Sequence, residues 1–185
     1  DVYKRQAHAG LAAQFADHSL DGPLIRAYEA LVWGAPSPAQ GTIDAPLDRD
    51  PKNRQKRAVA RVGGKRAQTH YSTQARFGPG PTVSPGASQV RCRLETGRTH
   101  QIRVHLAHIG HPLIGDLVYG AGFLTKAETL PPPLAARLRK FRRQALHAAV
   151  LGFQHPVNGD KLRFERPPPD NMAALIAGFQ AIPAE

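Results

Sequence analysis

The spacing of hydrophobic residues changes along the chain, and each spacing predicts a different element. In residues 88–95, Val90, Cys92 and Leu94 alternate with polar side chains. A period of two is typical of a half-buried strand, here with a basic outer face. Glycines 63 and 64 predict a hairpin turn between two further strands. Strands are also predicted at residues 24–34, at the start of 41–57, and at 57–62, 68–77, 145–156 and 161–167.

From residue 99 onward the spacing becomes helical. Ile102, Leu106 and Ile109 recur at steps of four and three, with Thr99 as the predicted N-cap and Gly110 as the stop. Other helices are predicted at residues 7–18, 129–144 and from about residue 170. Antiparallel strands with a few helices among them predict an α+β fold, with a mixed, mainly antiparallel sheet and flanking helices. The length of 185 residues fits a single domain.

Charge narrows the range of partners. Lys and Arg number 25 against 14 acidic residues, so the formal net charge is +11. A field of this sign attracts nucleic acid or an anionic membrane surface, although a generic solubilising surface is an alternative. No window of about 18 apolar residues is present, so no membrane span is predicted. The single cysteine excludes an internal disulfide and predicts a reducing, cytoplasmic setting.

Residues 94–120 concentrate basic and hydrogen-bonding side chains in an apolar frame. On the predicted helix, Gln101, His105 and His108 form a polar stripe beside the apolar one. Arg98 lies just before the helix, where free N–H groups and a guanidinium together suit a phosphate or a carboxylate. The alternative is a core helix whose histidines hydrogen-bond to backbone groups.

Histidines 100, 105, 108 and 111 raise the question of a metal site. Their spacing fits no common zinc pattern, and no carboxylate or cysteine lies among them. The surrounding positive charge also disfavours a bound cation. We therefore expect no metal.

The stretch LETGRTHQIRVHLAHIGHPLIGDLVYG, residues 94–120, closely resembles the signature of the RluA-type pseudouridine synthases. The likeness extends through RAYEALVWG, PLDRDPKNRQKRAV, AQTHYS and RQALHAAVLGFQHPVNG, over roughly residues 20–172. The resemblance implies the catalytic-domain fold of that family and an isomerase that converts uridine in RNA to pseudouridine without cofactor or metal. The target uridine has to leave the helical stack to be reached. Large-subunit ribosomal RNA is the expected substrate, transfer RNA the alternative, and a monomer the expected state.

The resemblance also implies roles for individual residues. Arg103 corresponds to the arginine that pairs with the family's catalytic aspartate, and Tyr28 to the tyrosine that stacks on the flipped base. An ion pair with a local carboxylate and an ordinary strand tyrosine are the alternatives for these two residues. Arg98 and His100 are expected to contact phosphate or to brace the site. Leu113 and Ile114 resemble an apolar wall of the pocket, with packing in the core as the alternative.

Two groups of basic residues are expected to contact RNA phosphates. The first comprises Arg49, Lys52, Arg54, Lys56 and Arg57. The second comprises Arg137, Arg139, Lys140, Arg142 and Arg143.

The family's aspartate motif, Arg-Leu-Asp-x-Asp-[ST]-[ST]-Gly, does not occur in the sequence. Residues 47–50, Leu-Asp-Arg-Asp, imitate it, but they follow Tyr28 instead of preceding it, so Asp48 is not expected to be the nucleophile. Even weaker candidates for the nucleophile are Asp17, Asp21 and Asp116. We interpret residues 1–185 as a truncated catalytic domain whose first six residues match nothing in the family, and as an inactive fragment. A non-catalytic basic RNA-binding module is the alternative.

Overall fold

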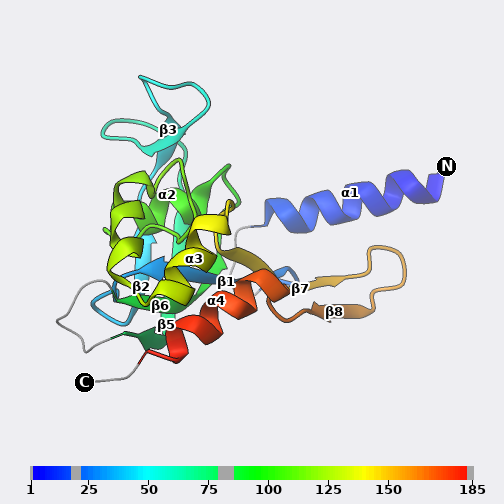
Figure 1. Ribbon diagram of the computed structural model, residues 1–185. Helices are drawn as coiled ribbons and strands as arrows, with labels where there is room; N and C mark the ends of the chain where they lie inside the picture. Colours follow the sequence, from blue (N-terminus) through cyan, green and yellow to red (C-terminus); the bar gives the residue numbers. More distant parts are fainter. Residues whose placement is uncertain (1, 18–21, 79–85, 183–185) are drawn as a thin grey trace.

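The computed structural model describes residues 2–17, 22–78 and 86–182. Its centre is a six-stranded sheet with the strand order β2-β5-β6-β1-β7-β8, in which every pairing is antiparallel (Figure 1). The strands are β1 (Ile25–Trp33), β2 (Gln40–Asp44), β5 (Gln68–Phe77), β6 (Ala87–Leu94), β7 (Leu146–Gln154) and β8 (Lys161–Glu165). The predicted α+β fold with a mainly antiparallel sheet is confirmed.

The helices pack on this sheet, except for α1. They are α1 (Val2–Ala16), α2 (Gln101–His108), α3 (Pro132–Lys140) and α4 (Asp170–Gln180), with a 3-10 segment η1 (Ala121–Thr129) before α3. Helix α1 projects away from the body (Figure 1). Its Gln14 side chain is joined to the backbone of Gln154 on β7 by two hydrogen bonds, of 2.7 and 2.9 Å.

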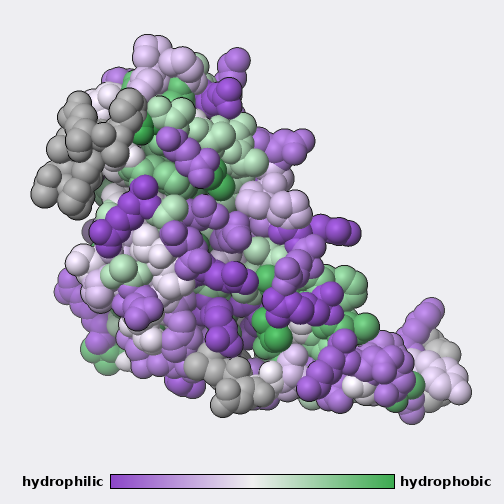
Figure 2. Space-filling view, turned by 90° about the horizontal axis from the view of Figure 1, so that it is seen from below, coloured by the Kyte–Doolittle hydropathy of each residue, from purple (hydrophilic) through white to green (hydrophobic). Residues whose placement is uncertain are grey.

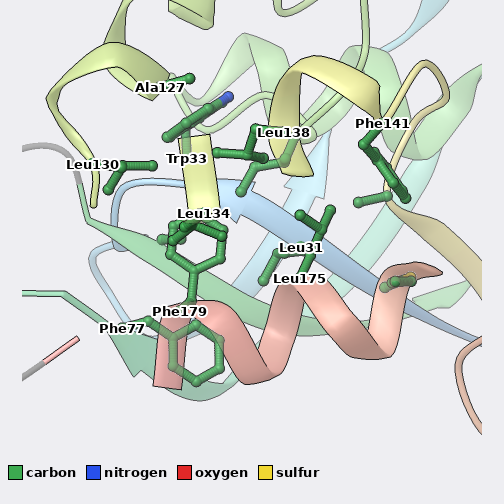
Figure 3. Packing of buried hydrophobic residues seen from close by; sticks show 14 residues of the cluster. Leu31, Trp33, Phe77, Ala127, Leu130, Leu134, Leu138, Phe141, Leu175 and Phe179 are labelled. Carbon is green, nitrogen blue, oxygen red and sulfur yellow. The ribbon is translucent and has the colours of Figure 1, made fainter. Parts of the chain in front are cut away.

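Strand β1 separates two cores, because its side chains alternate between the faces of the sheet. Ala30 and Val32 pack on the face covered by α2, against Ile102 and Leu106. The neighbouring residues of β1 point to the opposite face, where η1, α3 and α4 cover them (Figure 3). That second cluster includes Leu31, Trp33, Phe77, Leu134, Leu138, Leu175 and Phe179.

Strands β3 (Leu47–Arg49) and β4 (Arg57–Val59) form a separate two-stranded sheet that projects from the body (Figure 1). The hairpin predicted across glycines 63 and 64 is therefore wrong, since β4 pairs with β3 while β5 pairs with β2 and β6.

Asp50 explains why the turn forms earlier in the chain. Its carboxylate accepts the backbone N–H groups of Lys52 and Asn53, at 2.8 and 3.2 Å. Such side-chain bonds to the backbone stabilise a tight turn, so the chain reverses at residues 50–56. We call residues 47–59 the basic hairpin, because they carry the first predicted group of cations.

The start of α2 also differs from the prediction. The N-cap position is His100, not Thr99, and its backbone is left-handed with φ 60°. No side chain caps the helix. Instead the Gln101 side-chain oxygen accepts the backbone N–H of Arg98 at 2.9 Å. The predicted helix over 129–144 is shorter, because η1 occupies the residues before Leu130 and α3 ends at Lys140.

Large hydrophobic side chains are exposed at the end of the molecule from which α1 projects. Phe15, Leu151, Val157 and Phe164 are between 37% and 55% exposed, and Figure 2 shows an apolar patch beside α1. Within the described residues, no helix has the length and hydropathy needed to span a membrane.

Candidate active site

A cleft of about 280 Å³ lies between β1, the start of β7 and the first turn of α2. Five residues singled out from the sequence line it together: Tyr28, Arg98, His100, Gln101 and Arg103. Tyr28 is on β1, two residues before Ala30, and so points to the face covered by α2. The rest of the lining includes Leu94 on β6, Gln144 just before β7, and Leu146 at the start of β7. Residues of β1, β6, β7 and α2 thus meet at one cavity.

Arg103 is held by a carboxylate of its own chain. Its Nε donates to Oδ2 of Asp116 at 2.7 Å, and its Nη2 donates to Oδ1 at 2.9 Å. Oδ1 also accepts the backbone N–H groups of Val118 and Tyr119, at 2.9 and 3.1 Å. The bidentate geometry fixes the guanidinium plane. The local ion pair that was an alternative for Arg103 is therefore present.

The pair is stabilised in its charged form. Burial pushes the pKa of the Asp116 carboxyl upward, but the hydrogen bonds from Arg103 and from the Tyr119 and Val118 backbone outweigh it, so the pKa lies below its usual value. The hydrogen bond to Asp116 likewise raises the pKa of Arg103. Asp116 is 3% exposed, so its carboxylate is a fixed internal group.

Tyr119 is a member of the site that sequence reasoning missed. Its ring lies under the Arg103 guanidinium, 4.8 Å from ring centre to Cζ. Its hydroxyl oxygen accepts the backbone N–H of Arg57 on the basic hairpin at 2.9 Å, and lies 3.0 Å from Nδ1 of His100. Tyr119 therefore joins the basic hairpin to the cleft. Its position at the end of the 94–120 signature was the available signal.

His100 lines the cleft and lies next to Tyr119. Burial, together with the charge of Arg103, lowers the pKa of His100 below its ordinary value. The Tyr119 hydroxyl oxygen accepts the Arg57 N–H, so its own O–H is available to the lone pair of an unprotonated Nδ1 of His100. In the tautomer that accepts this bond, Nε2 carries the ring hydrogen.

The polar stripe predicted on α2 does not face the cleft as a unit. Gln101 lines the cleft but is almost fully buried, His105 is buried in the fold, and His108 is exposed. The Gln101 amide donates to the Thr69 hydroxyl at 3.0 Å, and that hydroxyl lies 2.9 Å from Nδ1 of His105. Nε2 of His105 lies 3.0 Å from the carbonyl oxygen of Ala45.

These contacts set the tautomer of His105. Because a carbonyl can only accept, Nε2 must donate to Ala45, and Nδ1 must accept from Thr69. Burial lowers the pKa of His105, in spite of the opposing bond to the Ala45 carbonyl. His105 is thus a neutral core histidine, as the structural alternative proposed.

The other histidines have separate surroundings. Nδ1 of His111 lies 2.9 Å from the carbonyl oxygen of Trp33. Within residues 2–17, 22–78 and 86–182, no three His, Cys, Asp or Glu side chains gather in a way that could hold a metal ion.

Leu113 and Ile114 were predicted as an apolar pocket wall, with core packing as the alternative, and in the structure they occupy the core. They are 1% and 0% exposed and pack in the two cores of the sheet. The backbone N–H of Ile114 donates to Leu31, and Leu113 pairs with Val32. The segment is held against β1 as part of the core, because its apolar side chains point into both clusters.

The remaining candidates lie outside the cleft. On the basic hairpin, Arg49, Lys52 and Arg54 are exposed and Lys56 and Arg57 are half-buried. Asp48 is exposed on β3, where its carboxylate accepts the N–H of Arg49 at 2.7 Å. Asp17 follows α1, and Asp21 lies outside the described residues. At the end of α3, the exposed cations are Arg137, Arg139, Lys140 and Arg142, and Arg143 is half-buried.

Fold and site together define a basic α+β protein whose cleft is lined by arginine, histidine and tyrosine side chains. Residues 4–108 match the family described as RNA pseudouridylate synthase. The chain belongs to this family, as the 94–120 signature indicated.

Relatives of known name support the assignment. The ribosomal large subunit pseudouridine synthase D of Zymomonas mobilis is 50% identical over 171 residues, which cover 92% of this chain and 48% of that protein. The protein of the same name from Escherichia coli is 43% identical over 158 residues, covering 85% of this chain and 45% of that protein. The chain spans about half the length of the curated relatives it matches.

Solved structures show the same fold. Human RNA pseudouridylate synthase domain containing 4 superposes with a TM-score of 0.68 at 21% identity, over 96% of this chain and 68% of that chain. Human RNA pseudouridylate synthase domain containing 1 gives a TM-score of 0.64 at 23% identity, over 96% and 72%.

Proposed function

We propose that this chain forms part of an enzyme that isomerises uridine to pseudouridine in large-subunit ribosomal RNA. The observation that carries the proposal is the common cleft of Tyr28 and Arg103, with Arg98 and His100 beside them. The names of the relatives from Zymomonas mobilis and Escherichia coli support the choice of ribosomal RNA.

Each side chain has a task that its position suits. The Tyr28 ring offers a stacking surface for a uracil that has left the helix. Arg98 and His100 supply donors for a phosphate or a ribose oxygen at the rim. In the reaction the N1–C1′ bond breaks, a C5–C1′ bond forms, N1 gains a proton, and the proton on C5 is released to water.

Arg103 is suited to hold a second carboxylate. Asp116 uses its Nε and one Nη2 hydrogen, and Nη1 forms no hydrogen bond with any residue in the described part of the chain. Because the family's aspartate motif does not occur in the sequence, we propose that another part of the enzyme, in the half that the relatives have beyond the match, supplies the catalytic aspartate. On this proposal, residues 1–185 alone do not catalyse the isomerisation.

A chimera tests the proposed function. Residues 1–185 replace the matching segment of the Zymomonas mobilis relative, to which they are 50% identical. The chimera is incubated with large-subunit ribosomal RNA tritiated at uridine C5, and released tritium is counted. We expect release by the chimera and none by residues 1–185 alone. Arg103→Met in the chimera should reduce the rate by about 100-fold or more, while Arg5→Met on the exposed part of α1 leaves it unchanged.

The second candidate is a non-catalytic basic RNA-binding module. It is favoured by the Arg103–Asp116 pair, which already neutralises the guanidinium within this chain. A folded chimera that binds the RNA with unchanged affinity but releases no tritium would select the module and reject the enzyme.

A further inference from the structure

A second cavity lies away from the cleft, in a groove of about 500 Å³ between the end of α3 and the first turns of α4. Its size falls within the range of about 300–1,000 Å³ that is usual for small-ligand sites. Four cations line it, and no acidic side chain does: Arg137, Lys140, Arg142 and Arg143. We call this cavity the α3–α4 groove.

The floor of the α3–α4 groove is apolar and fixed. Phe141 and Leu175 line it and belong to the buried core. The Arg143 guanidinium lies over the Phe141 ring, 5.1 Å from the ring centre, and its Nη2 donates to the Asn171 side chain at 2.8 Å. Arg143 is therefore held against an aromatic ring. A guanidinium plane held in this way is a stacking surface for a nucleobase.

Two of the four cations have no partner of their own in the part of the chain that is described and are therefore available to a ligand. Arg137 donates to the carbonyl oxygen of Ala174 at 3.2 Å, so it is tied to α4. By contrast, Lys140 and Arg142 are exposed and have no hydrogen-bond or ion-pair partner among the residues that the structure describes. Adjacent unpaired cations over an apolar floor are complementary to a nucleotide, which has anionic phosphates and a flat base.

The groove lies on the opposite face of the sheet from the cleft, but consecutive residues line the two cavities. Arg143 lines the α3–α4 groove, and the next residue, Gln144, lines the cleft that holds Tyr28. The turn before Asp116 packs tightly against the same segment, because a Cβ on Gly115 would stand 2.2 Å from the Arg143 carbonyl oxygen and 2.7 Å from the Phe141 ring. The segment of Arg143 and Gln144 therefore connects the two cavities.

We propose that the α3–α4 groove binds one unpaired nucleotide of the RNA that flanks the target uridine. The base stacks on the Arg143–Phe141 pair, and the adjoining phosphates contact Lys140 and Arg142. This proposal depends on the proposed function in one respect, namely that the same RNA strand also enters the cleft. It adds the requirement that the substrate be single-stranded on that side of the uridine.

Binding of short RNA by the 185-residue protein tests this site. Fluorescein-labelled 12-nucleotide oligouridylate is titrated by anisotropy over a series of potassium chloride concentrations. Each phosphate contact to a single strand contributes about 0.7 to the salt slope. The double variant Lys140→Ser/Arg142→Ser should therefore lower the slope by about 1.4 and weaken binding about tenfold at low salt. The matched control, Lys4→Ser/Arg5→Ser, removes the same charge from exposed positions on α1 and should leave the slope unchanged.

Two further probes separate a nucleotide site from a simpler one. Wild type should bind oligouridylate several-fold more tightly than a 12-nucleotide strand with abasic sugars, and Arg143→Ser should reduce this preference, because stacking in the groove is lost while Tyr28 is unchanged. An unchanged preference in Arg143→Ser would leave only a phosphate contact in the groove and overturn the proposal. Polyglutamate that competes as well as oligouridylate would mark a general polyanion site and overturn it too.

The outcome is distinguishable from failure of the proposed function. If the chimera releases no tritium but Lys140→Ser/Arg142→Ser lowers the salt slope as predicted, the proposed enzymatic activity is wrong and the nucleotide site in the groove is supported. An active chimera, together with equal slopes for Lys140→Ser/Arg142→Ser and its control, would reject the groove alone.

Discussion

The two faces of the central sheet are packed with different chemistry, although strand β1 supplies both. Leu31 and Trp33 point into an entirely apolar cluster beneath α3 and α4. Ala30 and Val32 point to the α2 face, where Gln101 and His105 are buried as well. An apolar core tolerates imprecise geometry, whereas each buried polar group needs its own partner. The difference teaches that one face stabilises the domain, while the other fixes the orientation of the residues around the cleft.

The largest expected effect is on the apolar face. Phe179 is fully buried, lies edge-on to Trp33 and is stacked on Phe77, with ring centres 6.3 Å apart in both pairs (Figure 3). Phe179→Ala should reduce the free energy of unfolding by about 3–5 kcal/mol, measured by urea denaturation. Tyr3→Ala, at a position on α1 that is 75% exposed, is the control and should change it by about 0.5 kcal/mol. Similar losses in both variants would contradict a core centred beneath α4.

The next effect concerns the ion pair that orients Arg103. Asp116→Leu leaves the guanidinium without its partner and should cost about 3 kcal/mol, because a partly buried charge is stranded. The double variant Arg103→Met/Asp116→Leu removes both charges and should be closer to wild type than Asp116→Leu. Urea denaturation of the wild type, of Arg103→Met, of Asp116→Leu and of the double variant gives the coupling energy. If the losses of the two single variants add up to the loss of the double variant, Arg103 and Asp116 do not stabilise each other.

The same pair predicts an acid dependence. The pKa of Asp116 is lowered in the folded protein, so the unfolded chain binds the proton more readily. The stability from this group is therefore present above its unfolded value near 3.8 and is lost as the pH falls through the folded pKa. The double variant should lack this component of acid unfolding.

A smaller effect comes from the buried histidine, at a different pH. The folded pKa of His105 lies below its unfolded value near 6.5, since burial disfavours the charged ring. Its contribution is complete above that value and declines as the pH falls toward the folded pKa, with a slope of at most about 1.4 kcal/mol per pH unit. His105→Gln should remove this slope when unfolding is followed between pH 7 and 5. Substitution of the exposed His108 by Gln is the matched control and should leave the slope in place.

The contrast between the faces also explains what the sequence could predict. Strand β6 followed from the alternation of Val90, Cys92 and Leu94, because period-two burial is a local property. Helix α4 could be predicted from the helical spacing of Met172, Leu175 and Phe179, which is also a local property. The apolar segment at Leu113 could be assigned to the pocket wall or to the core, and the sequence did not decide between them, since an apolar side chain suits both equally well.

The polar partners could not be predicted from spacing. Asp116 meets Arg103 across 13 residues, only because the chain turns at Gly115, where φ is 76°. The role of Tyr119 depends on a contact with Arg57, 62 residues away. The shared cleft of Tyr28 and Arg103 was anticipated from a family signature, not from periodicity, because such contacts are set by tertiary structure.

The smallest stability effect is expected at the contact that joins the α2 face to the basic hairpin. Tyr119→Phe keeps the ring beneath Arg103 but removes the oxygen that accepts the Arg57 N–H. The loss of one such hydrogen bond costs about 1 kcal/mol, so Tm should change little. Amide exchange at Arg57 should nevertheless accelerate by roughly fivefold, which corresponds to about 1 kcal/mol, and the His100 ring should lose its Nδ1 donor. Both are measured by NMR, with Tyr3→Phe on exposed α1 as control. Unchanged exchange at Arg57 would mean that the basic hairpin is held independently of the cleft, and that the polar face orients only the residues within it.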